Sequence, residues 1–265
     1  QLFSLSTAGI YKRRPVLAAL AGDSVASTSP LRERLEHIIT PQVLDRVADA
    51  WLQEGRRLAV IAVDMDCGKP ELLDLTAVAL QRDRPDRVAR YVDYLMASSA
   101  SPVAFPPVFI DGRMMVDGAL RQHIPFPSQI KRLLAGREQP GQRVNLFVIV
   151  NSPRLAIPQC ITDHVLLVAL RTGDVWTGER ANDSLALAMT DAARRGWTAR
   201  YVTPDGDLCQ PVPLPEDYFN PVFMQCQFEF GRQLALQEES PWQQEIESLS
   251  PFELRPVTQR HPCAR

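Results

Sequence analysis

The sequence predicts an α/β fold in which helices cover a mostly parallel central sheet. Two apolar runs, residues 58–63 and 144–150, contain almost no polar alternation, which is typical of strands buried on both faces of a sheet. Segments with helical spacing of apolar residues alternate with these runs, and that order favours parallel strands. The chain has 265 residues, of which 45% are hydrophobic and 23% charged, so it is long enough for one large domain with a substantial core.

The first half of the chain contains clear helix-start signals. Residues 15–20 predict a short helix, and residues 23–30 predict a loop. Ser29 before Pro30 predicts a cap that opens a helix over residues 31–39, and Thr40-Pro41 predicts the same device for a second helix, which Gly55 ends. The strand over 58–63 follows, and residues 72–80 fit either a strand or a short helix.

The later elements follow from the same two periodicities. Helices are expected over four further segments, at 86–95, 128–134, 161–171 and 180–195, the last two joined through Gly173 and Gly178; strands are expected at 144–150 and 197–202, and Asn220-Pro221 opens a final helix.

Two Asp-Gly pairs lie close together in the middle of the chain. Asp111-Gly112 stands between the apolar runs 108–110 and 114–116, which is a strong signal for a β-hairpin turn. Asp117-Gly118 follows the second of these runs directly. Taken alone, Asp117 is an ordinary turn aspartate.

The surroundings of Asp117 carry a longer pattern. Residues 97–126 contain Ala-Ser-Ser-Ala-Ser-Pro, then Phe-Pro-Pro-Val-Phe-Ile-Asp-Gly, then Val-Asp-Gly-Ala-Leu. This stretch resembles the block that carries the catalytic aspartate of patatin-like lipid acyl hydrolases. Weaker similarities in family order, at 23–32, 55–58 and 219–224, extend the resemblance over most of residues 15–235.

The resemblance implies a three-layer patatin-like fold and a serine hydrolase of the phospholipase A or esterase type. Patatin-like enzymes use a Ser-Asp dyad, in which an aspartate acts as base for a serine that is a poor nucleophile by itself. By resemblance Asp117 is that base, while Gly118 and Ala119 keep its loop tight. No cofactor or metal is implied. The implied partner is a lipid or acyl-ester substrate, met at a membrane or micelle surface.

The nucleophile is the missing part of this pattern. The family carries it in Gly-x-Ser-x-Gly, and the 265 residues contain neither this motif nor a Gly-rich oxyanion loop. The nearest match is Gly22-Asp23-Ser24-Val25-Ala26, but no buried strand precedes it. We therefore expect residues 1–265 to form one patatin-like domain that lacks its N-terminal strands, with residues 238–265 as a peripheral tail. The alternatives are a non-catalytic protein that binds lipid or a partner, and an inactive fragment without the nucleophile.

Composition excludes several other classes. The formal net charge is −2, which gives no electrostatic footprint for nucleic acid. The four histidines lack the spacing of a helical metal pair, and the five cysteines lack Cys-x-x-Cys spacing, although one or two disulfides remain possible. Asp64 and Asp66 indicate a polar strand end rather than a metal site. His123 indicates a loop residue rather than one that shapes the mouth of the site. No apolar run reaches the length of a membrane span. The sequence leaves the compartment open.

Phe105, Pro106, Pro107, Met114 and Met115 are apolar residues within the same block. We consider two interpretations, an acyl-chain surface beside Asp117 or ordinary packing of the hairpin. Ser98 and Ser99 are expected to close a helix end rather than act as nucleophiles.

Overall fold

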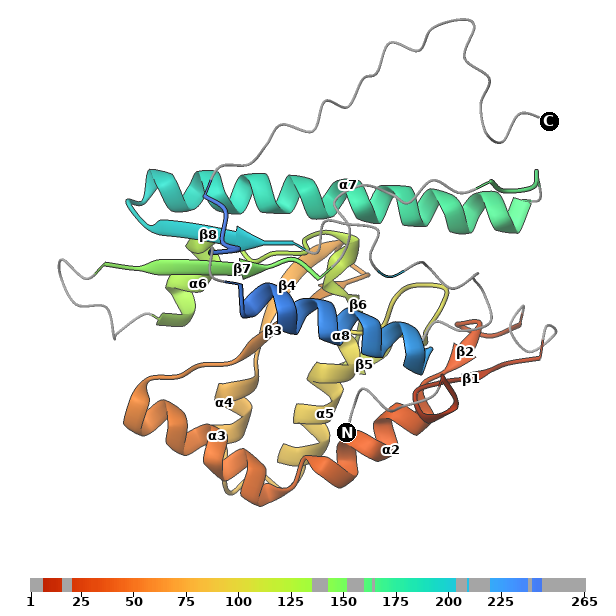
Figure 1. Ribbon diagram of the computed structural model, residues 1–265. Coiled ribbons are helices and arrows are strands. Elements are labelled where there is room, and N and C mark those ends of the chain that lie inside the picture. The colour runs from red at the N-terminus through yellow and green to blue at the C-terminus, as the bar shows by residue number, and fades with distance from the viewer. Residues whose placement is uncertain are drawn as a thin grey trace, which may run out of the picture.

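The computed structural model describes residues 7–15, 21–134, 143–151, 160–163, 165–203, 209, 220–237 and 240–244. The predicted helix at 15–20 and most of the predicted tail at 238–265 fall outside these residues. Figure 1 shows the long helix α7 and the strands β7 and β8 on one side of the molecule, and the helices α2 to α5 on the other.

The chain begins with three short elements, η2 (Thr7–Gly9), β1 (Lys12–Arg13) and β2 (Ala26–Ser27). Two helices follow them, α2 (Ser29–Ile38) and α3 (Pro41–Glu54). Thr40 caps α3 as predicted, because its Oγ1 accepts a hydrogen bond from the Val43 amide, and Gly55 ends α3 in the left-handed conformation. The predicted cap at Ser29 is wrong: Ser29 is the first helical residue, and Thr28 holds the cap position without a side-chain hydrogen bond.

The largest sheet contains the hairpin that the sequence predicts. Its strands are β3 (Ala59–Asp64), β4 (Lys69–Asp74), β5 (Val108–Ile110) and β6 (Arg113–Asp117), in the order β4-β3-β6-β5. Asp111 and Gly112 form the β5–β6 turn with φ of 51° and 79°. Residues 72–80, which fit either a strand or a short helix, contain both: β4 ends at Asp74, and α4 (Leu75–Leu80) begins at the next residue.

The α/β class is confirmed, but the predicted parallel pairing is not found in this sheet. All three of its strand pairs are antiparallel. For two of these pairs the reason is local: β3 to β4 and β5 to β6 are joined by turns of a few residues, and such turns connect only antiparallel strands. Among the described strands, the one parallel pair is β7 (Asn145–Ile149) with β8 (Thr198–Val202).

Helix α7 (Val165–Arg194) corrects a second prediction. The sequence predicted two helices joined through glycines, whereas the structure has one helix of 30 residues. Gly173 lies inside it, and a Cβ added there would meet nothing within 4 Å, so the cost of this glycine is conformational and modest. The remaining helices are α5 (Arg87–Ala97), α6 (Pro127–Leu134) and α8 (Pro221–Ala235), with the 3-10 turn η3 (Gly118–Leu120) after β6.

The core fixes the sheet against α5. Ala62 and Met115 from the sheet pack with Val92 and Met96 from α5, and Met115 is fully buried. Met115 is therefore a core residue and is not available as part of an acyl-chain surface. A separate cluster joins α7 to the β7–β8 pair, and Leu185 and Tyr201 lie at its centre.

Candidate functional site

Asp117 is the last residue of β6, at the point where the chain leaves the sheet. Its strand partner is Ala62 on β3, and its amide donates to the Ala100 carbonyl oxygen at 3.0 Å. The strand and the loop after α5 thus hold the backbone of Asp117 from two sides. The contribution of Ala100 is through its carbonyl group, so no side-chain signal in the sequence could have revealed it.

The carboxylate of Asp117 is oriented by the turn that follows. Oδ1 accepts a hydrogen bond from the Ala119 amide at 2.9 Å, which makes Asp117 the cap of η3. Gly118 allows this turn to lie against β3: a Cβ at this position would stand 2.7 Å from both Cγ2 and the carbonyl oxygen of Ile61. The expectation that Gly118 serves close approach therefore has a definite contact in the structure, namely Ile61.

The environment of Asp117 disfavours its charged form. Burial raises the pKa of the Asp117 carboxyl, and the hydrogen bond from Ala119 opposes this rise only in part. In the part of the chain that the structure describes, no cationic side chain pairs with Asp117, and no hydroxyl donates to it. A partly buried carboxylate without a cation is the environment expected of a general base rather than of a salt-bridged structural residue.

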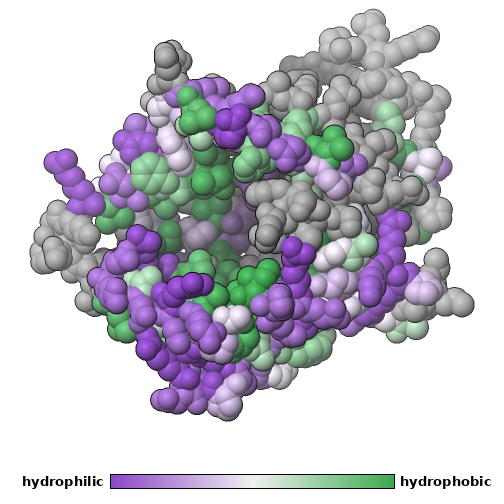
Figure 2. All heavy atoms as spheres, turned by 60° about the horizontal axis from the view of Figure 1, so that its bottom comes forward, coloured by the Kyte–Doolittle hydropathy of each residue, from purple (hydrophilic) through white to green (hydrophobic). Residues whose placement is uncertain are grey.

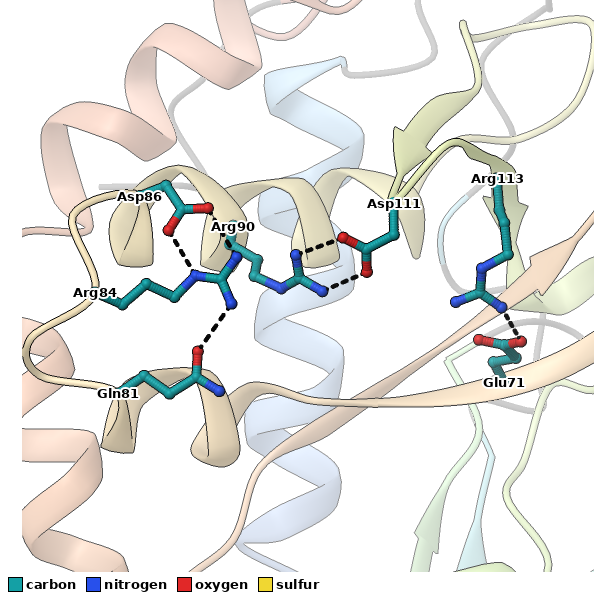
Figure 3. A network of polar contacts seen from close by, with 7 residues as sticks. All are labelled: Glu71, Gln81, Arg84, Asp86, Arg90, Asp111 and Arg113. Carbon is teal, nitrogen blue, oxygen red and sulfur yellow. Dashed lines mark hydrogen bonds and ion pairs between the residues drawn. The ribbon is translucent and has the colours of Figure 1, made fainter.

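Asp111, in the other Asp-Gly pair, has the opposite environment. Arg90 reaches from α5 and donates to both of its carboxylate oxygens, at 2.9 and 2.5 Å, as Figure 3 shows. This hydrogen-bonded pair lowers the pKa of the Asp111 carboxyl. The same figure shows Arg113, at the start of β6, bonded to Glu71 on β4. Arg113 also contacts Asp64 at 3.3 Å, so both ends of the hairpin turn are tied to neighbouring elements.

Ser24 does not meet Asp117 in the structure. Its Oγ lies 2.9 Å from Asp23 Oδ1 and 3.0 Å from the Ala26 carbonyl oxygen, and the residue is 4% exposed. Asp23 is in turn paired with Arg14 at 2.7 Å. The hydroxyl is thus engaged within its own loop, and the described structure gives it the geometry of a turn serine.

His123 is placed six residues beyond Asp117, and one feature sets it apart from a plain loop residue. Its amide donates to Ser184 Oγ on α7 at 3.2 Å, while its Nε2 is buried and has no hydrogen-bond partner among the described residues. Burial lowers the pKa of this imidazole, so the neutral form is favoured. The sequence favours a loop residue here over one at the site mouth, and it does not reveal the contact with α7, because that contact joins residues 61 positions apart.

Asp64 and Asp66 form a turn. Asp64 Oδ1 accepts from the amides of Asp66 and Cys67 at 2.9 and 3.3 Å, which is how an aspartate closes a tight turn after a strand. Within the described ranges, no three His, Cys, Asp or Glu side chains gather in a way that could hold a metal ion. The turn explains both residues as the polar end of β3.

A disulfide joins Cys209 to Cys226 on α8, and both cysteines are among the described residues. Cys160 is also disulfide-bonded, while Cys67 is free and exposed. The sequence had left one or two bridges open.

The comparison with known families agrees with the resemblance seen in the sequence. Residues 10–128 match the family model described as Patatin-like phospholipase, and this range contains Asp117, Gly118, Ala119 and Ser24. The match supports a lipid hydrolase family of the phospholipase type for this part of the chain. A search of curated proteins returns no match.

Proposed function

We propose that this chain, whose residues 10–128 are patatin-like, supplies the aspartate base of a serine lipid acyl hydrolase. The observation that carries the proposal is the environment of Asp117. Its carboxylate sits at a strand end, is oriented by the Ala119 amide, has no cationic partner among the described residues and has a raised pKa. A raised pKa makes the carboxylate a stronger base for a neighbouring hydroxyl.

The proposed reaction is acyl transfer to a serine followed by hydrolysis. The serine Oγ forms a bond to the acyl carbon of the ester while its proton passes to Asp117. The ester C–O bond then breaks, and the departing alcohol takes that proton. In the second half, water attacks the acyl-serine and gives its proton to Asp117, which returns it to the serine as the fatty acid leaves.

The serine itself is proposed to come from a segment outside residues 1–265. The sequence contains no Gly-x-Ser-x-Gly, and the hydroxyl of Ser24 bonds to Asp23 and Ala26. On this proposal, the chain is one patatin-like domain whose first strands, oxyanion loop and nucleophile are supplied by that segment. Residues 238–265 would form its tail.

The proposed substrate is an acyl ester of a lipid, approached at a membrane or micelle surface. Figure 2 shows a face of the molecule that is hollowed, with apolar side chains in its depth and hydrophilic ones around them. A hollow of this kind suits an acyl chain better than a charged ligand. The search for membrane spans covered the described residues, and none of their helices is both long and apolar enough to cross a bilayer.

Labelling with a fluorophosphonate tests the proposal, with intact mass and peptide mapping as the readout. The 265-residue chain and a longer form with the preceding sequence are labelled side by side. We expect an adduct on the longer form that maps to a serine before Gln1 and is abolished by Asp117→Asn. Asp111→Asn is the matched control, because it makes the same change in the other Asp-Gly pair and should leave the adduct in place. A stable adduct on Asp117→Asn would refute the role of Asp117 as base.

A second function is favoured by one observation. Among the described residues, the carboxylate of Asp117 accepts a hydrogen bond only from its own turn, as a purely structural aspartate does. This arrangement fits a non-catalytic patatin-like protein that binds lipid or a partner, and equally an inactive fragment. Absence of an adduct in both forms, together with binding to lipid vesicles, would support the binding protein. Absence of both would support the fragment.

A further inference from the structure

Val103 has an unfavourable backbone conformation. Its φ is 70°, and Val103 and Asp111 are the two non-glycine residues there with positive φ. For Asp111 the hairpin turn explains the value, but a β-branched residue rarely enters this region. Val103 is 61% exposed, so its burial does not offset the strain.

The strained residue is held in place by its neighbours on both sides. The Phe105 amide donates to the Ser101 carbonyl oxygen at 2.9 Å and closes a turn around Val103. The Val103 carbonyl oxygen accepts from the Val25 amide at 2.8 Å, and Ala104 accepts from Ala26 at 3.0 Å. These contacts fix the strained conformation, and strain that is held in this way is often found at functional sites.

The turn 101–105 begins one residue after a backbone contact of Asp117. The Ala100 carbonyl oxygen, which accepts from the Asp117 amide, comes directly before the turn. Val103 is three positions after Ala100 in the chain, so their Cα atoms are at most about 11 Å apart. Val25 is bonded to the same turn and is itself 44% exposed. Two exposed apolar residues therefore belong to the loop that bonds to Asp117 or are hydrogen-bonded to it: Val103 lies in the loop, and Val25 bonds to Val103.

We propose that Val103 and Val25 contact the acyl chain of the substrate and favour long-chain over short-chain esters. This inference rests on the proposed function, because it assigns the substrate class at the same site. The chemistry of the turn points to an acyl chain rather than a head group: residues 101–105 read Ser-Pro-Val-Ala-Phe and carry no charge. Arg14, whose amide donates to the Val25 carbonyl oxygen, has its guanidinium paired with Asp23.

Val103→Asn is the variant that separates ligand contact from backbone strain. Asparagine tolerates positive φ better than valine, so the thermal stability should stay the same or rise. The apolar contact is lost, and since each buried methylene contributes about fourfold in affinity, binding of a long acyl chain should weaken roughly 5- to 10-fold. Val103→Gly relieves the strain in the same way and serves as a second variant.

The first measurement is binding of dansyl-undecanoic acid to the 265-residue chain, followed by fluorescence. Leu52→Gln is the matched control, because Leu52 is 56% exposed and lies on α3, away from the β1–β2 pair in Figure 1. We expect weaker binding for both Val103 variants and for Val25→Ser, and unchanged binding for Leu52→Gln. Equal binding by the wild type and the Val103 variants, or no binding by the wild type, would overturn the inference.

The second measurement separates this inference from the proposed function. The form that reacts with fluorophosphonate is assayed for kcat/KM on p-nitrophenyl butyrate and laurate. A fall of about 5- to 10-fold in the laurate-to-butyrate ratio on Val103→Asn is expected. Turnover with an unchanged ratio would overturn the acyl-chain contact and leave the hydrolase intact. A third outcome is a protein that hydrolyses neither ester but binds dansyl-undecanoic acid less tightly on Val103→Asn. That outcome would support the contact between Val103 and the acyl chain and would reject the proposed hydrolase function.

Discussion

Replacing Gly118 by alanine tests how closely the Asp117 turn must approach the sheet. The added Cβ would lie 2.7 Å from Cγ2 and from the carbonyl oxygen of Ile61, and 2.8 Å from Ile61 Cβ. The carbonyl oxygen belongs to the backbone of β3, so the turn and the strand must separate to relieve the contact. Overpacking of this kind costs about 1–3 kcal/mol.

The magnitude is large enough to measure by thermal denaturation. A loss of 1 kcal/mol lowers the Tm of a domain of this size by roughly 2–4 °C, so Gly118→Ala should lower it by roughly 2–12 °C. Labelling by fluorophosphonate should fall as well, because the displaced turn carries the Asp117 carboxylate. Gly231→Ala is the matched control: nothing lies within 4 Å of its added Cβ, and alanine should stabilise α8 by about 0.5–1 kcal/mol.

A second variant identifies the atoms responsible. Ile61→Ala removes Cγ2 but leaves the Cβ and the carbonyl oxygen in place, so it should not rescue Gly118→Ala. The double variant is therefore expected to be at least as unstable as Gly118→Ala alone. A wild-type Tm for Gly118→Ala, or full rescue by Ile61→Ala, would refute the close approach of the turn to the β3 backbone.

Three further predictions follow from the same structure. Because the folded-state pKa of Asp117 is raised, its contribution to stability is fully present below its unfolded pKa and is lost as pH rises through the folded pKa; Asp117→Asn should therefore be at least as stable as wild type at pH 7 by thermal denaturation, and its advantage should shrink in acid. Arg90→Ala should lower the free energy of unfolding by less than about 1 kcal/mol in urea titrations, because Asp111 is a largely exposed partner. Reduction of the Cys209–Cys226 bridge should speed hydrogen exchange of the α8 amides, since α8 has no buried residue among those described and the bridge constrains it; unchanged exchange would contradict this.

The local features of the fold could be predicted from the sequence where one residue type determines them. Thr40 with Pro41, Gly55 and Asp111-Gly112 each specify a cap or turn through their own chemistry, and each is found as predicted. Strand direction could not be predicted in this way. The run at 58–63 predicts a strand buried in a parallel sheet, but the short β3–β4 turn makes its pairing with β4 antiparallel, and no local pattern records its antiparallel direction relative to β6.

The candidate site could be predicted only in part. The Asp-Gly-Ala pattern singled out Asp117, but the residues that hold its turn, Ala100 against Asp117 and Ile61 against Gly118, contribute backbone atoms or packing that no motif records. The positive φ of Val103 could not be predicted from the sequence either, because valine rarely adopts positive φ. Residues that contradict local preference are the ones that sequence patterns miss, and they tend to occur at functional sites.

The two Asp-Gly pairs together make the strongest argument for a special role of Asp117. Both pairs are the same dipeptide and stand at the two ends of the same strand, β6. Local chemistry alone would therefore give the two carboxyls similar pKa values. In the structure Arg90 neutralises Asp111 and lowers its pKa, which is what a turn aspartate on the surface gains from a salt bridge. Asp117 is instead partly buried and pairs with no cation among the described residues, and burial raises its pKa. A structural turn would be served better by the environment of Asp111, whereas proton transfer from a hydroxyl is served better by that of Asp117.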